Sequence, residues 1–197
     1  MRTLIIIPVL LFSLFLGASS YSADFNKGLT AAQSGDFATA LKEWKPLAEE
    51  GNAVAQNNLG LMYHNGWGVP QDDKEAVYWY RLAVEQGYAI AQYNLGLMYE
   101  KGKGVPQDYK EAARLYRLAA EQGLADAQNN LANRYYYGEG VNKDIVYAHM
   151  WKNISASNGI DEAREELKII EKKMTTSDIS EAQRLARECV KKNYKGC

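Results

Sequence analysis

Several residue types that often carry chemistry are scarce in this chain of 197 residues. It contains two histidines, His64 and His149, and two cysteines, Cys189 and Cys197. No cysteine or carboxylate at ligand spacing accompanies either histidine, so we expect neither a metal site nor a cofactor. Basic and acidic side chains are nearly balanced, 23 against 24. Nucleic acids and anionic membranes bind polybasic surfaces, so this balance argues against both as partners.

Long apolar runs are also missing, with one exception at the N-terminus. Residues 4–16 are apolar apart from Pro8 and Ser13, follow Met1-Arg2, and precede a small-residue stretch at 17–20. The run is too short to span a bilayer comfortably and is typical of a cleaved secretory signal. We predict a signal peptide over residues 1–23 and a periplasmic or secreted mature chain that does not insert into the membrane. An uncleaved N-terminal anchor is the alternative.

Both cysteines fall in the last nine residues. In an exported protein, an even and clustered pair favours a disulfide over two free thiols. We therefore expect a bridge between Cys189 and Cys197 that fixes the C-terminal tail, without any catalytic implication.

What the chain does have is a repeated unit of 36 residues, at 53–88, 89–124 and 125–160. The first two copies agree at 25 positions and differ at 11, with no gap. The third copy differs at more positions but keeps Ala127, Gln128, Asn130 and Leu131 in register. Repeats of this length form solenoids, because each unit is too small to bury its apolar face alone and packs it against the next.

Each unit is predicted to form two antiparallel helices. In the first, helix A, apolar residues such as Ala55 and Leu59 recur at spacings of three and four. Gly66 suits the left-handed residue that ends such a helix. Asp72 is a candidate N-cap for the second, helix B, and Glu75 three residues later would complete a capping box.

Glycines inside helix A and altered copies of the unit at both ends complete this picture. Gly60 and Gly96 stand inside helix A, where the lack of a side chain lets helix axes approach closely. Residues 24–52 are a degenerate helix pair, and residues 161–197 are capping helices and a tail. Such polar ends close a solenoid.

The run AQ-x-NLGLMY-x-x-G-x-GVPQD-x-KEA, at 55–76 and again at 91–112, resembles the Sel-1-like repeat (SLR) family, relatives of the tetratricopeptide repeat. The resemblance covers nearly all of the predicted mature chain. It implies an all-α, right-handed solenoid of helix pairs whose A helices line a concave surface. It also implies a role as an adaptor or scaffold for protein complexes, and many bacterial members are exported.

An enzyme is the competing interpretation, because a secreted, cysteine-rich branch of this family is linked to β-lactam binding and hydrolysis. A serine acyl enzyme of that kind needs Ser-x-x-Lys, and no serine here has lysine three residues on. Tyr63-His64-Asn65 imitates a Tyr-x-Asn element, but Tyr63 lies on the packing stripe of helix A. That branch also carries disulfides in every repeat, and the repeats of this chain contain no cysteine. We therefore expect a non-catalytic module that binds a protein or peptide.

The candidate binding surface is the side of helix A opposite its packing stripe. At 100° per residue, this side comprises unit positions 2, 5, 9 and 12. Four of the 11 differences between the first two units fall at positions 2, 5, 12 and 13, where packing alone would favour repetition. The candidate partner-binding residues offer apolar, aromatic or amide groups to a peptide: Asn57, Leu61, Ile90, Tyr93, Leu97, Asn129, Asn133 and Tyr136.

Tyr93 and Leu97 are expected at the centre of this surface and outside the inter-repeat core. The alternative is that Leu61 and Leu97 are covered by the curvature of the superhelix and by neighbouring A helices. Asn58, Asn94 and Asn130 recur identically at the flank, so we expect them to form hydrogen bonds between repeats.

Overall fold

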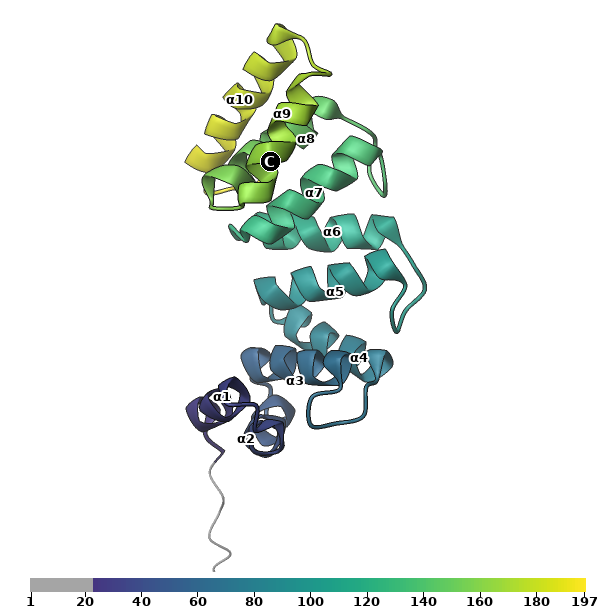
Figure 1. Cartoon of the computed structure of the whole chain (residues 1–197), viewed down its shortest axis with the longest axis vertical. Helices are drawn as coiled ribbons and strands as arrows, with labels where there is room; N and C mark the ends of the chain where they lie inside the picture. Colours follow the sequence, from purple (N-terminus) through teal and green to yellow (C-terminus); the bar gives the residue numbers. More distant parts are fainter. Residues whose placement is uncertain (1–22) are drawn as a thin grey trace, which may run out of the picture.

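The computed structural model describes residues 23–197, so the predicted signal peptide lies outside the described residues except for Ala23. That part of the chain contains ten helices and no strand, which confirms the predicted all-α repeat solenoid. The helices stack along one long axis (Figure 1). They are α1 (Phe25–Gln33), α2 (Phe37–Glu49), α3 (Ala53–Asn65), α4 (Asp73–Glu85), α5 (Ala89–Lys101), α6 (Tyr109–Ala120), α7 (Ala125–Tyr137), α8 (Ile145–Ser157), α9 (Asp161–Glu171) and α10 (Thr176–Lys191).

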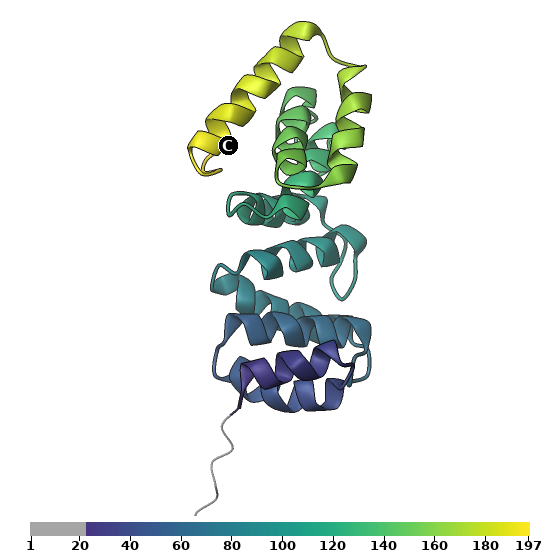
Figure 2. The same ribbon diagram turned by 60° about the vertical axis from the view of Figure 1, so that its left-hand side comes forward.

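Helices α3 to α8 form the three repeat units, with α3, α5 and α7 as A helices and α4, α6 and α8 as B helices. The last two helices depart from this pairing. Both α9 and α10 pack on α8, but they make few contacts with each other. Figure 2 shows them diverging from the turn that joins them. Within the described residues, no helix is both long and apolar enough to cross a membrane.

Local chemistry fixes the ends of the helices inside each unit. Gly66 ends α3 with a φ of 70°, in the left-handed region that glycine adopts at no steric cost. Asp72 caps α4 by accepting from the backbone N–H groups of Lys74 and Glu75. The predicted capping box at this point is wrong, because Glu75 does not bond back to its cap. The box forms instead at α10, between Thr175 and Asp178.

The glycines inside the A helices make room for a tyrosine of the B helix. A Cβ atom built on Gly60 would lie 2.5 Å from Cε1 of Tyr80, and one on Gly96 would lie 2.7 Å from Cε1 of Tyr116. Real side chains do not approach so closely, so the ring packs against bare backbone. This confirms that both glycines permit close approach of the helices.

Buried glutamines of the A helices tie neighbouring units together. Gln56 Nε2 donates to the carbonyl of Ala48 at 3.0 Å, and Gln86 Nε2 donates to Gln56 Oε1 at 2.7 Å. The pattern returns two units later, where Gln128 donates to Ala120 and accepts from Asn158. Each amide therefore satisfies a helix end of the preceding unit and is itself satisfied within its own unit.

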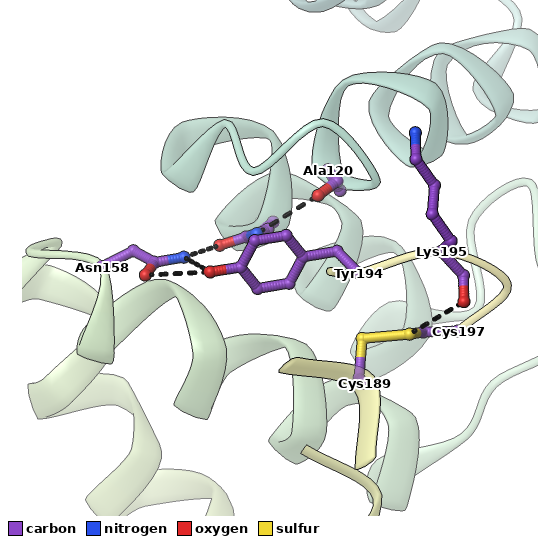
Figure 3. The surroundings of a disulfide bond; sticks show 7 residues. Ala120, Asn158, Cys189, Tyr194, Lys195 and Cys197 are labelled. Atoms are coloured by element: carbon purple, nitrogen blue, oxygen red, sulfur yellow. Dashed lines mark hydrogen bonds between the residues drawn. A yellow bond between two sulfur atoms is a disulfide. The ribbon is translucent and has the colours of Figure 1, made fainter. Parts of the chain in front are cut away.

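The C-terminal tail folds back onto the array. Cys189 and Cys197 form a disulfide with a Cα–Cα distance of 5.6 Å (Figure 3). In the closed loop, Tyr194 adopts a φ of 65°, rare for a residue with a side chain. Its ring lies against Gly123, and its hydroxyl accepts from Asn158 Nδ2 at 3.3 Å. The tail thus braces the end of the third unit.

Candidate functional site

The eight candidate residues differ widely in exposure. Ile90 is the most exposed, at 41%. Leu61, Tyr93, Leu97, Asn133 and Tyr136 are half-buried, whereas Asn57 and Asn129 are buried, at 3% and 9% exposed. Six of the eight candidate residues therefore reach solvent, whereas Asn57 and Asn129 are covered.

The expectation that Asn57 and Asn129 offer free amides is wrong. Asn57 Oδ1 accepts from Asn94 Nδ2 on the next A helix at 2.9 Å, which confirms the inter-repeat hydrogen bond expected of Asn94. Asn129 Oδ1 accepts from Lys152 Nζ at 2.6 Å. The helical wheel assumed one packed side and one free side. In the solenoid, position 5 is also covered by other helices: by Asn94 of the next A helix at Asn57, and by Lys152 of the B helix α8 at Asn129.

Tyr93 and Leu97 are not separate from the core, contrary to expectation. Both are half-buried and pack against the cluster that contains Tyr116 and Leu131. The rings of Tyr93 and Tyr116 are 5.9 Å apart between centroids. Burial raises the pKa of the Tyr93 hydroxyl, and the negative charges of Asp126 and Glu100 raise it further. Substitutions at these two positions must therefore affect stability as well as any binding.

An apolar hollow of about 250 Å³ lies between α1, α2 and α3. Trp67, 43% exposed, forms one edge and stacks on Phe37 with the ring centroids 5.2 Å apart. Trp44, Met62 and Leu61 also line it. Sequence reasoning missed Trp67 and Phe37. The available signal was that unit 1 carries an aromatic residue where unit 2 carries a lysine.

A second hollow, of about 200 Å³, is lined from α3 by Leu61 and His64 and from α5 by Asn94, Leu97 and Lys101, among others. Since Leu61 lines both hollows, they are neighbours along the A helices. Together they form a surface with an apolar part near Trp67 and a more polar part near Lys101. We call this surface the A-helix groove.

A smaller hollow of about 120 Å³ lies between the third unit and α9, where Asn133 and Tyr136 line it together with Lys152 and Glu166. The side chain of Lys152 is 1% exposed; its Nζ donates to Asn129 and Asn133 and pairs with Glu166. Burial lowers the pKa of this ammonium, and the Glu166 carboxylate opposes that shift. Sequence reasoning did not single out Lys152.

The two histidines belong to separate pairs. His64 Nδ1 lies 2.6 Å from Asp73 Oδ1, and His149 Nε2 lies 3.0 Å from Glu171 Oε1. Among residues 23–197, no group of three or more His, Cys, Asp or Glu side chains could hold a metal ion. Each histidine instead connects neighbouring helices.

Residues 53–88, 89–124 and 125–160 each match the Sel1 repeat, over the same ranges as the three 36-residue units. The chain belongs to the Sel1 repeat family. Sel1 repeats are typically protein-interaction modules, and the family is generally non-catalytic.

Solved Sel1 structures share this fold. A Sel1 repeat protein from Oxalobacter formigenes is 28% identical, with a TM-score of 0.73 over 84% of this chain and 75% of that protein. A protective antigen of uropathogenic Escherichia coli that displays an SLR fold is 32% identical, with a TM-score of 0.74 over 85% of this chain. The chain spans 41% of that antigen's length. No curated protein matches the chain.

Proposed function

We propose that this Sel1 repeat chain is an exported, non-catalytic adaptor that holds an extended segment of another protein in the A-helix groove. The observation that carries the proposal is the pair of neighbouring hollows that share Leu61, with the half-exposed Trp67 at the edge of one of them. Aromatic side chains at a concave surface serve as anchors of protein interfaces.

The spacing of the groove suits an extended segment. Neighbouring helices pack about 8–10 Å apart, and an extended chain advances about 3.3 Å per residue, so about three residues cover one A helix. An aromatic or aliphatic side chain of the segment would enter the hollow beside Trp67. The next part of the segment would then pass Leu97 and Lys101.

The state of Lys152 supports a non-catalytic role. A lysine ammonium has three N–H donors, and Asn129, Asn133 and Glu166 supply three acceptors around Nζ. A general base needs a free lone pair, so this buried lysine is poorly placed to serve a β-lactam hydrolase. Hydrolysis of nitrocefin by the purified chain would favour the enzyme instead.

A photo-crosslinking amino acid at position 67 tests the proposal, with the same probe at position 78 as a control. Tyr78 is 53% exposed on α4 and lines neither hollow of the A-helix groove. We expect position 67 to crosslink a protein in the native envelope that position 78 does not. With that protein purified, Trp67→Ala combined with Leu61→Ser should weaken binding at least tenfold, whereas Tyr78→Ala should not. Equal affinity for both variants would place the partner elsewhere.

A further inference from the structure

A further groove outside the A-helix surface lies between α8 and α10. Its volume is about 510 Å³, and it shares no lining residue with the three hollows described above. Ile154 of α8 and Ala186 of α10 form a buried floor, whereas Val190 at its edge is 47% exposed. Apolar surface therefore reaches solvent beside a helix that departs from the repeat pairing.

Two cations of α10 line the same groove, Arg187 and Lys191. Neither forms an ion pair with any residue in the described part of the chain. Arg184, one turn earlier, is instead held by Glu181 and Glu188. No carboxylate lines the groove, and Lys192 and Lys195 follow in the tail. In a chain with nearly balanced charge, this edge is locally basic and complementary to an acidic partner.

The groove is held open by the way α10 is anchored. Ala186 and Cys189 of α10 are buried in the core that includes Trp151 and Ile154 of α8. The disulfide to Cys197 fixes the helix one residue before Val190. The apolar floor and the cationic edge therefore keep their relative positions before any partner arrives, which reduces the ordering cost of binding.

The dimensions of the groove suit a short helix. From Gln183 to Lys191 it follows eight residue steps of α10, about 12 Å at 1.5 Å per residue. Arg187 and Lys191 are one turn apart on the same face of α10. Two carboxylates separated by three or four residues on a partner helix would match them, with aliphatic side chains on the same helix over the floor.

We propose that the α8/α10 groove docks an acidic amphipathic helix of a partner protein. Its aliphatic side chains pack on Ile154 and Val190, and two carboxylates one turn apart pair with Arg187 and Lys191. This second docking site is independent of the A-helix groove, so an adaptor of this kind can hold two proteins at once.

The test uses the full mature chain and a synthetic helical probe of 14 residues, with leucines along one face and two glutamates one turn apart at its edge. We expect the probe to bind at least tenfold more tightly than a control peptide with glutamine in place of both glutamates. Binding should weaken as salt is raised, because paired surface charges are screened.

Arg187→Glu with Lys191→Glu should reduce affinity for the acidic probe at least tenfold. Lys45→Glu with Lys172→Glu, on α2 and at the end of α9, changes the net charge equally and should leave affinity unchanged. Circular dichroism must show the same helix content in both double variants. A photoreactive leucine analogue on the probe should label α8 or α10.

Three results would overturn the proposal. One is equal affinity for the acidic and the glutamine peptides. Another is equal affinity of the two double variants for the acidic probe. The third is labelling of the A-helix groove. A lipid surface would be the ligand instead if the parent chain bound vesicles with anionic lipid but not the peptide, and if Arg187→Glu with Lys191→Glu abolished the vesicle binding. Leu61→Ser, which impairs the proposed A-helix groove, should not affect the probe.

Discussion

The Nζ atom of Lys152 lies 2.6 Å from Oδ1 of Asn129, in the position where the two preceding units place a tyrosine ring. Tyr80 and Tyr116 stand at the same unit position and pack on Gly60 and Gly96. In the third unit, the glycine position holds Ala132, and a buried ammonium replaces the ring. The same site is therefore filled in two ways: by a tyrosine ring against glycine in the first two units, and by a lysine beside alanine in the third.

Combining the tyrosine of one arrangement with the alanine of the other should lower the stability of the fold. Lys152→Tyr alone forces a ring against the Cβ of Ala132, and overpacking of this kind costs about 1–3 kcal/mol. Adding Ala132→Gly removes the clash and should recover about 1 kcal/mol or more, although glycine has lower helix propensity. Urea unfolding of both single variants and the double variant measures the coupling. Additive effects would contradict the shared packing site.

Buried tyrosines should make stability fall at alkaline pH. Burial, together with the charge of Asp73, raises the pKa of Tyr80 well above its ordinary value. Below the unfolded-state pKa of about 10, both states keep the proton, so this contribution is fully present. Above it, only the unfolded chain ionises readily, and the contribution falls by about 1.4 kcal/mol per pH unit until the folded-state pKa is reached.

Unfolding free energies from pH 9 to 11.5 test this dependence. Tyr80→Phe should lose stability less steeply with pH than the parent chain does. Tyr137, 62% exposed, supplies the control, because Tyr137→Phe should keep the parent slope. Identical slopes for all three proteins would mean that Tyr80 ionises in the folded state.

The disulfide should stabilise the tail and not the whole array. A short loop restricts the unfolded chain by somewhat less than the roughly 3 kcal/mol of a 15-residue loop. In a Cys189→Ser, Cys197→Ser variant, the tail from residue 190 should lose amide protection, and Tyr194 should leave Asn158. Units 53–88 and 89–124 should keep their protection in hydrogen exchange. Global unfolding, or two free thiols in the oxidised parent, would contradict this.

Substitutions of Leu95 and Leu97 should separate the effect on stability from the effect on binding only in part. Leu95 is 3% exposed, so Leu95→Ala should cost about 2–5 kcal/mol of stability. Leu97 is half-buried, so Leu97→Ser should cost less stability than Leu95→Ala. It should, however, weaken binding of a partner to the A-helix groove more than Leu95→Ala does. Thermal unfolding and binding, measured on the same samples, give both values. The reverse order would assign Leu97 to the core alone.

Export makes a simple prediction about mass. We expect the mature chain to begin between Tyr21 and Asp24, because the short apolar run ends in small residues. Intact-mass measurement of protein from the cell envelope gives the start directly. Recovery of the full-length chain in the membrane fraction would favour the uncleaved anchor.

The features that the sequence predicted are those that local chemistry determines. The left-handed stop at Gly66 and the aspartate cap at Asp72 each depend on a few adjacent residues, and the 36-residue period is visible directly in the sequence. Contacts between units could not be read in this way: whether Asn57 is free or paired depends on Asn94, 37 positions away. The stacking of Trp67 on Phe37 likewise joins two units.

The buried glutamine of the A helix has a consequence for how such chains change length. Gln56 and Gln128 donate to equivalent carbonyls, those of Ala48 and Ala120, at the end of the preceding B helix. The α2/α3 and α6/α7 junctions therefore use the same side chain and the same backbone position. Deleting residues 89–124 in frame would bring Gln128 to the end of α4 with the same donor and acceptor. Whole units can thus be gained or lost by recombination without a new interface, which lets the reach of the array change while each joint stays satisfied.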